Sequence, residues 1–116
     1  MLRKIPLGKK NIYSVFMHRE FLYTVSQDMS IKAVDIERFE LARHAKKAVR
    51  GMARILGQYD GHLVVADSNK ISLWDLNTLA HHSTLEFPTG QYNKGAALWE
   101  NTLFGSDFQY VYGRDL

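Results

Sequence analysis

The stretch Asp67-Ser68-Asn69-Lys70-Ile71-Ser72-Leu73-Trp74-Asp75 decides the fold of this chain. Its first four residues are polar and predict a tight turn, and the five that follow alternate like a β-strand. Similar strand endings recur at intervals of 40 residues, at Val34-Asp35-Ile36, Trp74-Asp75-Leu76 and Arg114-Asp115-Leu116. Two further sets keep this interval, namely Ile31, Ile71 and Val111, and Tyr23, Leu63 and Leu103. A fixed period of this length indicates a repeat architecture, so the chain consists of similar units.

Each unit predicts short strands separated by polar turns, and about 40 to 45 residues is the length of one four-stranded propeller blade. We predict an all-β fold of three blades of four antiparallel strands, in a single partial propeller domain over residues 1–116 with units at about 1–36, 37–76 and 77–116. The predicted strands are 12–17, 21–26, 31–35, 39–44, 52–56, 62–66, 71–75, 79–87, 96–99, 102–106 and 111–115. Residues 36–56 taken alone resemble an amphipathic helix, but one helical segment does not explain three matching units.

The composition is that of an ordinary soluble protein, with 46% hydrophobic and 23% charged residues. The chain has no cysteine, which excludes disulfides and thiolate chemistry and fits a reducing compartment. No apolar run reaches the length of a signal peptide or a membrane span, so we expect a cytoplasmic or nuclear protein with no membrane partner. The net charge of +3 is mildly basic, and nucleic acid binding usually needs a more clustered patch.

Two stretches, Ser26 to Asp35 and Asp67 to Asp75, resemble the WD-repeat β-propeller family. Both have a small residue, a turn aspartate, an isoleucine and a strand that closes near an aspartate, although only Trp74-Asp75 is a true Trp-Asp pair. The Gly-His pair of that family is missing, with Arg43-His44 its nearest approach. The resemblance implies a structural role for Asp28, as the turn aspartate that anchors neighbouring loops, and for the strand-end residues Asp35, Trp74, Asp75 and Asp115.

The phase of the repeat suggests how the propeller closes. In the family, a sequence repeat runs from the outer strand of one blade through the three inner strands of the next. This chain ends with an inner strand at Asp115, and Met1 to Ile5 aligns with the outer strands near Leu41 and His81. We expect two chains to pair head to tail into a six-bladed ring, in which each N-terminal strand completes the last blade of the other chain. The rival interpretation is a piece of a longer propeller.

Catalytic, metal and cofactor sites are not expected. Adjacent His81 and His82 on a strand face opposite sides, and no spacing of histidines or carboxylates suits a metal ion. Ser26, Ser106, His62 and Asp67 supply the residue types of a hydrolytic triad but lack a nucleophile motif.

The function that we predict is a protein-interaction scaffold, with protein partners and a homodimer. Candidate partner-binding residues are the basic or aromatic residues Lys46, Lys47, Arg50, Tyr92 and Trp99. The alternative is a propeller that binds a non-protein ligand, either a nucleic acid through its basic loops or a carbohydrate through its aromatic side chains.

Overall fold

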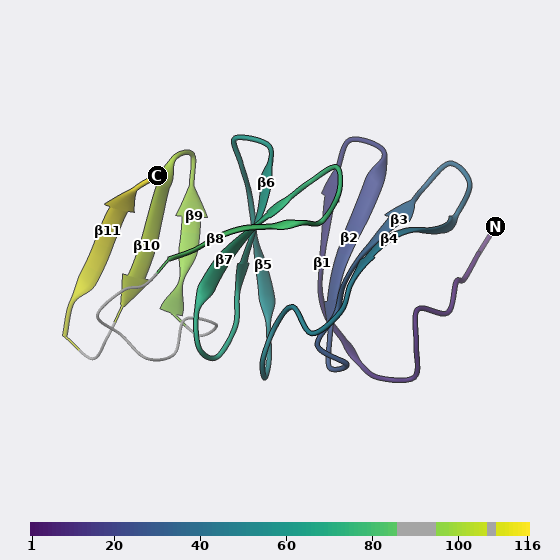
Figure 1. The fold of residues 1–116 in the computed structure, drawn as a ribbon, viewed down its shortest axis with the longest axis horizontal. Coiled ribbons are helices and arrows are strands. Elements are labelled where there is room, and N and C mark those ends of the chain that lie inside the picture. Colours follow the sequence, from purple (N-terminus) through teal and green to yellow (C-terminus); the bar gives the residue numbers. More distant parts are fainter. Residues whose placement is uncertain (86–94, 107–108) are drawn as a thin grey trace.

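The computed structural model of the chain describes residues 1–85, 95–106 and 109–116, and these residues form three antiparallel sheets side by side (Figure 1). Blade 1 contains β1 (Ile12–His18), β2 (Phe21–Ser26), β3 (Ile31–Asp35) and β4 (Glu40–Ala45) in that spatial order. Blade 2 contains β5 (Arg54–Tyr59), β6 (His62–Ala66), β7 (Ile71–Asp75) and β8 (His81–Leu85). Blade 3 contains β9 (Ala97–Trp99), β10 (Thr102–Ser106) and β11 (Val111–Asp115).

The predicted all-β propeller fold is confirmed. Blade 3 has three strands among the described residues, as expected for a blade whose outer strand comes from a second copy. Met1 to Ile5, expected as that outer strand, forms no strand in the single chain. The helical alternative for residues 36–56 is wrong, because β4 and the start of β5 occupy that segment.

One further correction concerns the phase of the first unit. Val25 pairs with Ile31 across the five residues 26–30, whereas Ala66 pairs with Ile71 across the four residues 67–70. The extra residue shifts β2 by one position relative to the repeat. Leu22, instead of the predicted Tyr23, therefore corresponds to Leu63 and Leu103.

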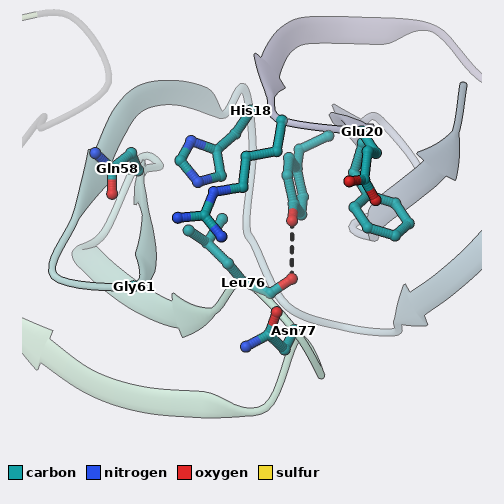
Figure 2. Close-up of a pocket in the computed structure, with 9 residues that line it drawn as sticks. His18, Glu20, Gln58, Gly61, Leu76 and Asn77 are labelled. Atoms are coloured by element: carbon teal, nitrogen blue, oxygen red, sulfur yellow. Dashed lines mark hydrogen bonds between the residues drawn. The ribbon is translucent and has the colours of Figure 1, made fainter.

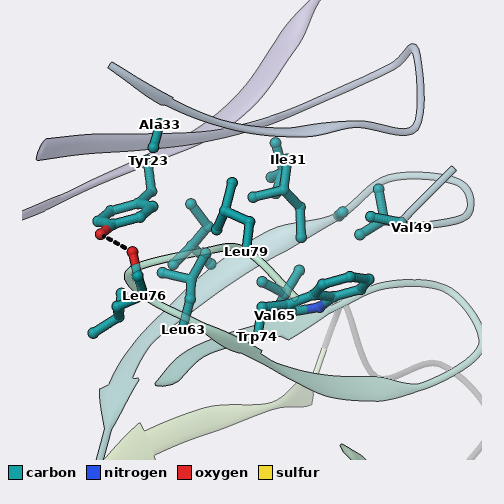
Figure 3. Close-up of a cluster of buried hydrophobic side chains, with 13 residues drawn as sticks. Tyr23, Ile31, Ala33, Val49, Leu63, Val65, Trp74, Leu76 and Leu79 are labelled. Carbon is teal, nitrogen blue, oxygen red and sulfur yellow. Dashed lines mark hydrogen bonds between the residues drawn. The ribbon is translucent and has the colours of Figure 1, made fainter. Parts of the chain in front are cut away.

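The larger core lies between blades 1 and 2 and consists of side chains from both sheets together with the linker between them (Figure 3). Tyr23 is buried there, and its hydroxyl donates a hydrogen bond of 2.8 Å to the carbonyl oxygen of Leu76. Trp74 also packs in this core, and its indole nitrogen donates to the Ser72 hydroxyl at 2.8 Å. A second core between blades 2 and 3 includes Val64, Ala66, Ile71, Leu73 and Leu103.

Two sheet faces have no blade in front of them in this chain. Because side chains alternate along a strand, the face of blade 1 that points away from blade 2, here called the front face, carries Val15, Met17, Leu22, Thr24, Lys32, Val34 and Leu41. By the same rule the face of blade 3 that points away from blade 2, the back face, carries Ala97, Trp99, Thr102, Phe104, Ser106 and Val111. The two faces lie at opposite ends of a molecule whose longest dimension is 46 Å (Figure 1).

Residues 1–11, the N-terminal segment, lie along blade 1 at the end far from the C-terminus (Figure 1). The Arg3 guanidinium lies 4.7 Å from the centre of the Phe39 ring at one edge of the front face. At the opposite edge, a Cβ on Gly8 would lie 3.5 Å from the Asp28 carboxylate. The segment therefore spans the front face, and Thr24, Lys32 and Val34 are buried there although no blade covers them. Among the described residues, no helix has the length and apolarity that crossing a membrane requires.

Candidate functional site

The antiparallel topology divides the charged residues between the two loop faces of the molecule. The basic loop face consists of residues 8–11 and the connections 27–30, 46–53 and 67–70, and its cations are Lys9, Lys10, Lys46, Lys47, Arg50 and Lys70. The basic loop face also has the carboxylates Asp28 and Asp67. The opposite loop face carries Arg19 and Arg38 and a larger set of carboxylates, namely Glu20, Asp35, Glu37, Glu40, Asp60, Asp75, Glu100 and Asp115. The small net charge thus conceals a strong polarity from one loop face to the other.

The connection between β4 and β5, residues 46–53, here called the basic linker, is held rigidly between blades 1 and 2. Ala48, Val49 and Ala53 are buried in the core between these blades. The backbone N–H groups of Ala48 and Val49 both donate to the carbonyl oxygen of Met29, at 2.7 and 3.3 Å. The predicted partner-binding residues Lys46, Lys47 and Arg50 of the same linker are exposed.

Asp67 fixes the other end of the basic linker. This carboxylate is 1% exposed and accepts hydrogen bonds from the backbone of Arg50 at 2.9 Å, of Asn69 at 2.7 Å and of Lys70 at 2.9 Å. The Arg50 carbonyl oxygen in turn accepts from the Ser68 backbone and hydroxyl. Asp67 therefore holds a neighbouring loop, which is the role that the resemblance implies for Asp28.

Asp28 is instead the centre of a local network within its own turn. Its carboxylate accepts from the Ser26 and Ser30 hydroxyls, the Ser30 backbone and the Lys32 ammonium, the last at 2.9 Å. Burial acts to raise the pKa of Asp28, but these hydrogen bonds outweigh it and hold the pKa well below its ordinary value. Lys32 is 4% exposed on the front face, and the Asp28 carboxylate balances its positive charge.

The strand-end aspartates begin equivalent turns in blades 1 and 2. Asp35 accepts from the backbone of Glu37 and Arg38, and Asp75 accepts from the backbone of Asn77 and Thr78. The backbone hydrogen bonds from Thr78 and Asn77 lower the pKa of Asp75. Asp115 accepts a hydrogen bond from the Thr102 hydroxyl at 3.2 Å across β10 and β11. These aspartates therefore lie at strand ends or in turns, and Trp74 lies in the core.

Of the two aromatic partner-binding candidates, the structure describes Trp99 and does not bring it to the basic linker. Trp99 lies on the back face at the end of β9 and is 65% exposed. Tyr92 lies outside the described residues.

A cavity of about 350 Å³ opens on the acidic loop face between blades 1 and 2 (Figure 2). Polar side chains of His18, Arg19, Glu20, Gln58 and Asn77 line it, and the hydrogen bond from Tyr23 to Leu76 closes its inner side. His62, in contrast, packs against His82 on the surface of blade 2, with ring centres 4.1 Å apart. No group of three or more histidine or acidic side chains among the described residues is arranged to hold a metal ion.

Sequence reasoning missed Met29 and Met52, which are 43% and 62% exposed beside the cations of the basic linker. It also missed Asp67 as an anchor, because the partner backbone of Arg50 lies 17 residues away along the chain. The available signal for Asp67 was its place before the Ile71 strand, shared with Asp107 before Val111.

No protein-family model and no curated protein sequence matches the chain. Among solved structures, it is similar to the computationally designed Ika4 protein, with 16% identity, a TM-score of 0.76, and coverage of 97% of this chain and 70% of Ika4. The RRP9 WD40 repeats give 15% identity and a TM-score of 0.72, covering 98% of this chain and 38% of RRP9. The Myceliophteria thermophila Cps50 (Swd1) β-propeller domain gives 20% identity and a TM-score of 0.65, covering 95% of this chain and 40% of Cps50. The chain thus has a β-propeller fold and spans about two fifths of the length of these two propeller domains.

Proposed function

We propose that the chain is a protein-interaction scaffold of the β-propeller type, and that two copies of it assemble into a six-bladed ring. The observation that supports this proposal is that the front and back faces correspond to the two halves of an interface that the chain forms twice internally. Ile71 is fully buried between blades 2 and 3, whereas Val111 at the matching position of the back face is 75% exposed. Ile55 is 9% exposed, whereas the matching Val15 of the front face is 59% exposed.

A front face and a back face from two copies are complementary in the same sense as the blades within one chain. Pairing them head to tail buries Trp99 and Val111 of one copy against Val15 and Met17 of the other. Repeating the contact once closes a ring by two-fold symmetry, and six blades lie within the usual range of about four to eight. The closed ring then has one basic and one acidic loop face.

The N-terminal segment covers the front face in the single chain, so ring formation requires it to move. In the ring it becomes the outer strand beside β11 of the other copy, the position that Met1 to Ile5 occupies in the repeat. Exchange of an identical segment between two copies is a low-cost route to a dimer.

Light scattering with size-exclusion chromatography tests the assembly. We expect a mass of twice 13.4 kDa for the natural chain. Val111→Glu and Met17→Glu place a charge in the contact and should give monomers, whereas Asn77→Glu on the acidic loop face should remain dimeric. Deletion of residues 1–6 should also weaken the dimer.

A monodisperse monomer at high protein concentration would exclude the two-copy ring and favour a piece of a longer propeller. A broad series of larger masses would indicate open head-to-tail association instead of closure.

A further inference from the structure

We propose that the basic linker and its neighbours bind an acidic protein segment that also carries apolar side chains. This inference deepens the proposed scaffold function by naming the chemistry of its partner, and it concerns a surface separate from the front and back faces. The binding surface consists of Lys46, Lys47, Arg50, Met29 and Met52.

The charges of this surface are available to a partner. Lys46, Lys47 and Arg50 are exposed and have no ion pair with any described residue. The two nearest carboxylates, Asp28 and Asp67, are already paired with lysines at 2.9 and 3.3 Å. Burial and the positive charges of Lys32 and Lys46 lower the pKa of His44, so this histidine is uncharged at neutral pH and the positive charge of the surface comes from the lysines and Arg50. An acidic ligand is therefore attracted without competition from carboxylates of this face.

The surface is also preorganised. The basic linker is held by hydrogen bonds to Met29 on blade 1 and to Asp67 and Ser68 on blade 2. Its buried alanines and valine hold the backbone in the core. A partner therefore meets fixed backbone positions, and little ordering entropy is lost on binding.

Two methionines distinguish a protein partner from a nucleic acid. Met29 and Met52 are exposed, and the Met29 carbonyl oxygen accepts two hydrogen bonds from the linker that carries the cations. Methionine and arginine are enriched at protein interfaces, and methionine adapts to varied apolar side chains. Residues 8–11, 27–30, 46–53 and 67–70, which carry the cations, contain no aromatic side chain on which a base would stack; the exposed Tyr110 of this loop face lies in the turn of blade 3.

The test uses fluorescence anisotropy with three probes: a peptide of glutamates and serines with two leucines, the same peptide with serines for leucines, and single-stranded oligo-thymidine. We expect the leucine-containing peptide to bind most tightly, and its affinity to fall between about 50 and about 200 mM salt because the attraction is electrostatic. The combined variant Lys46→Gln, Lys47→Gln and Arg50→Gln should lower the affinity for that peptide about tenfold. The control Lys4→Gln, Arg19→Gln and Arg38→Gln removes equal charge elsewhere and should change affinity less than about twofold.

The methionines are tested separately, with Met29→Gln and Met52→Gln combined. This variant should lower the affinity for the leucine-containing peptide about fivefold and leave the affinity for the leucine-free peptide unchanged. The inference is overturned if oligo-thymidine binds as tightly as the leucine-containing peptide, or if the peptides do not bind at low salt. It is also overturned if the control variant loses as much affinity for the peptide as the combined variant of Lys46, Lys47 and Arg50. Unchanged thermal unfolding shows that each variant is folded. A dimer that fails to bind the peptides contradicts this inference alone, whereas a monomer that binds them contradicts only the ring.

Discussion

Blades 1 and 2 have the same order of strands, but the faces that they turn in the same direction meet different surroundings. Blade 2 presents Leu63, Val65 and Trp74 to blade 1, and all three are buried by another sheet. At the matching positions of the front face, blade 1 has Leu22, Thr24 and Val34. The leucine is the same in both blades, but Thr24 is more polar than Val65 and Val34 is smaller than Trp74, and the N-terminal segment spans this face.

The same difference extends to the charged groups. Ser72 on blade 2 accepts a hydrogen bond from Trp74, whereas the matching residue on blade 1 is Lys32, paired with Asp28. A buried ion pair gains little net stability relative to apolar packing. The comparison teaches that one strand plan supports two kinds of surface: an apolar interface buried between two blades, and a mixed face that the N-terminal segment spans.

Leu63→Ala is expected to lower the free energy of unfolding more than any other substitution considered for the two blades. Leu63 is fully buried between two blades, and removal of its side chain leaves a cavity that costs about 2–5 kcal/mol. The matched Leu22→Ala on the front face should cost about 1 kcal/mol, because this side chain is only half-buried and no second sheet packs on it. Urea unfolding measures both. Equal losses would mean that the front face is packed as firmly as the internal interface.

Asp67→Ala should rank second. It leaves the backbone N–H groups of Arg50, Asn69 and Lys70 without their acceptor, and we expect a loss of about 3 kcal/mol. Asp28→Ala, at the partly exposed turn of blade 1, should cost at most about 1.5 kcal/mol. Hydrogen exchange of the Arg50 amide should accelerate in the first variant only. Similar exchange rates in both variants would show that Asp67 does not hold the linker.

The sequence predicted β2, β3, β6, β7, β10 and β11 with the bounds that the structure has. These strands alternate and are bounded by polar turns, so local pattern is enough. It placed the start of β5 too early, at Met52 instead of Arg54, because Met52 and Ala53 at the end of the linker are apolar. Ala48 and Val49 are buried between the two blades although they belong to a loop. Local periodicity does not distinguish such a buried loop from a strand or a helix.

The candidate site was predicted only in part. Lys46, Lys47 and Arg50 were found from charge clustering, but Met29 belongs to another connection and joins them only through hydrogen bonds to the folded linker. The single extra residue between Val25 and Ile31 displaced Tyr23 and obscured the equivalence of the turns. A one-residue change in a turn leaves no mark on composition.

The Asp28 carboxylate should make the free energy of unfolding depend on pH. Its pKa is lowered in the folded state by hydrogen bonds from Ser26, Ser30 and Lys32, which outweigh burial. The unfolded chain binds its proton near pH 4, so this contribution is full above that pH and is lost as the pH falls towards the folded pKa. Asp28→Asn should therefore make stability less dependent on pH below about 4. An unchanged acid profile, measured by urea unfolding at a series of pH values, would contradict this assignment.

Arg3→Ala should have the smallest effect and tests the cover of the front face directly. The Arg3 guanidinium lies 4.7 Å from the centre of the Phe39 ring, and an exposed cation–π contact contributes about 0.5–1 kcal/mol. Arg38→Ala is the matched control, because Arg38 makes only an exposed ion pair of 3.9 Å with Glu40 and should change stability by less than about 0.5 kcal/mol. If the N-terminal segment leaves the front face during ring formation, the Arg3 variant should also dimerise at lower protein concentration than the natural chain. Weaker dimerisation would mean instead that Arg3 acts in the ring and that the contact with Phe39 does not compete with assembly.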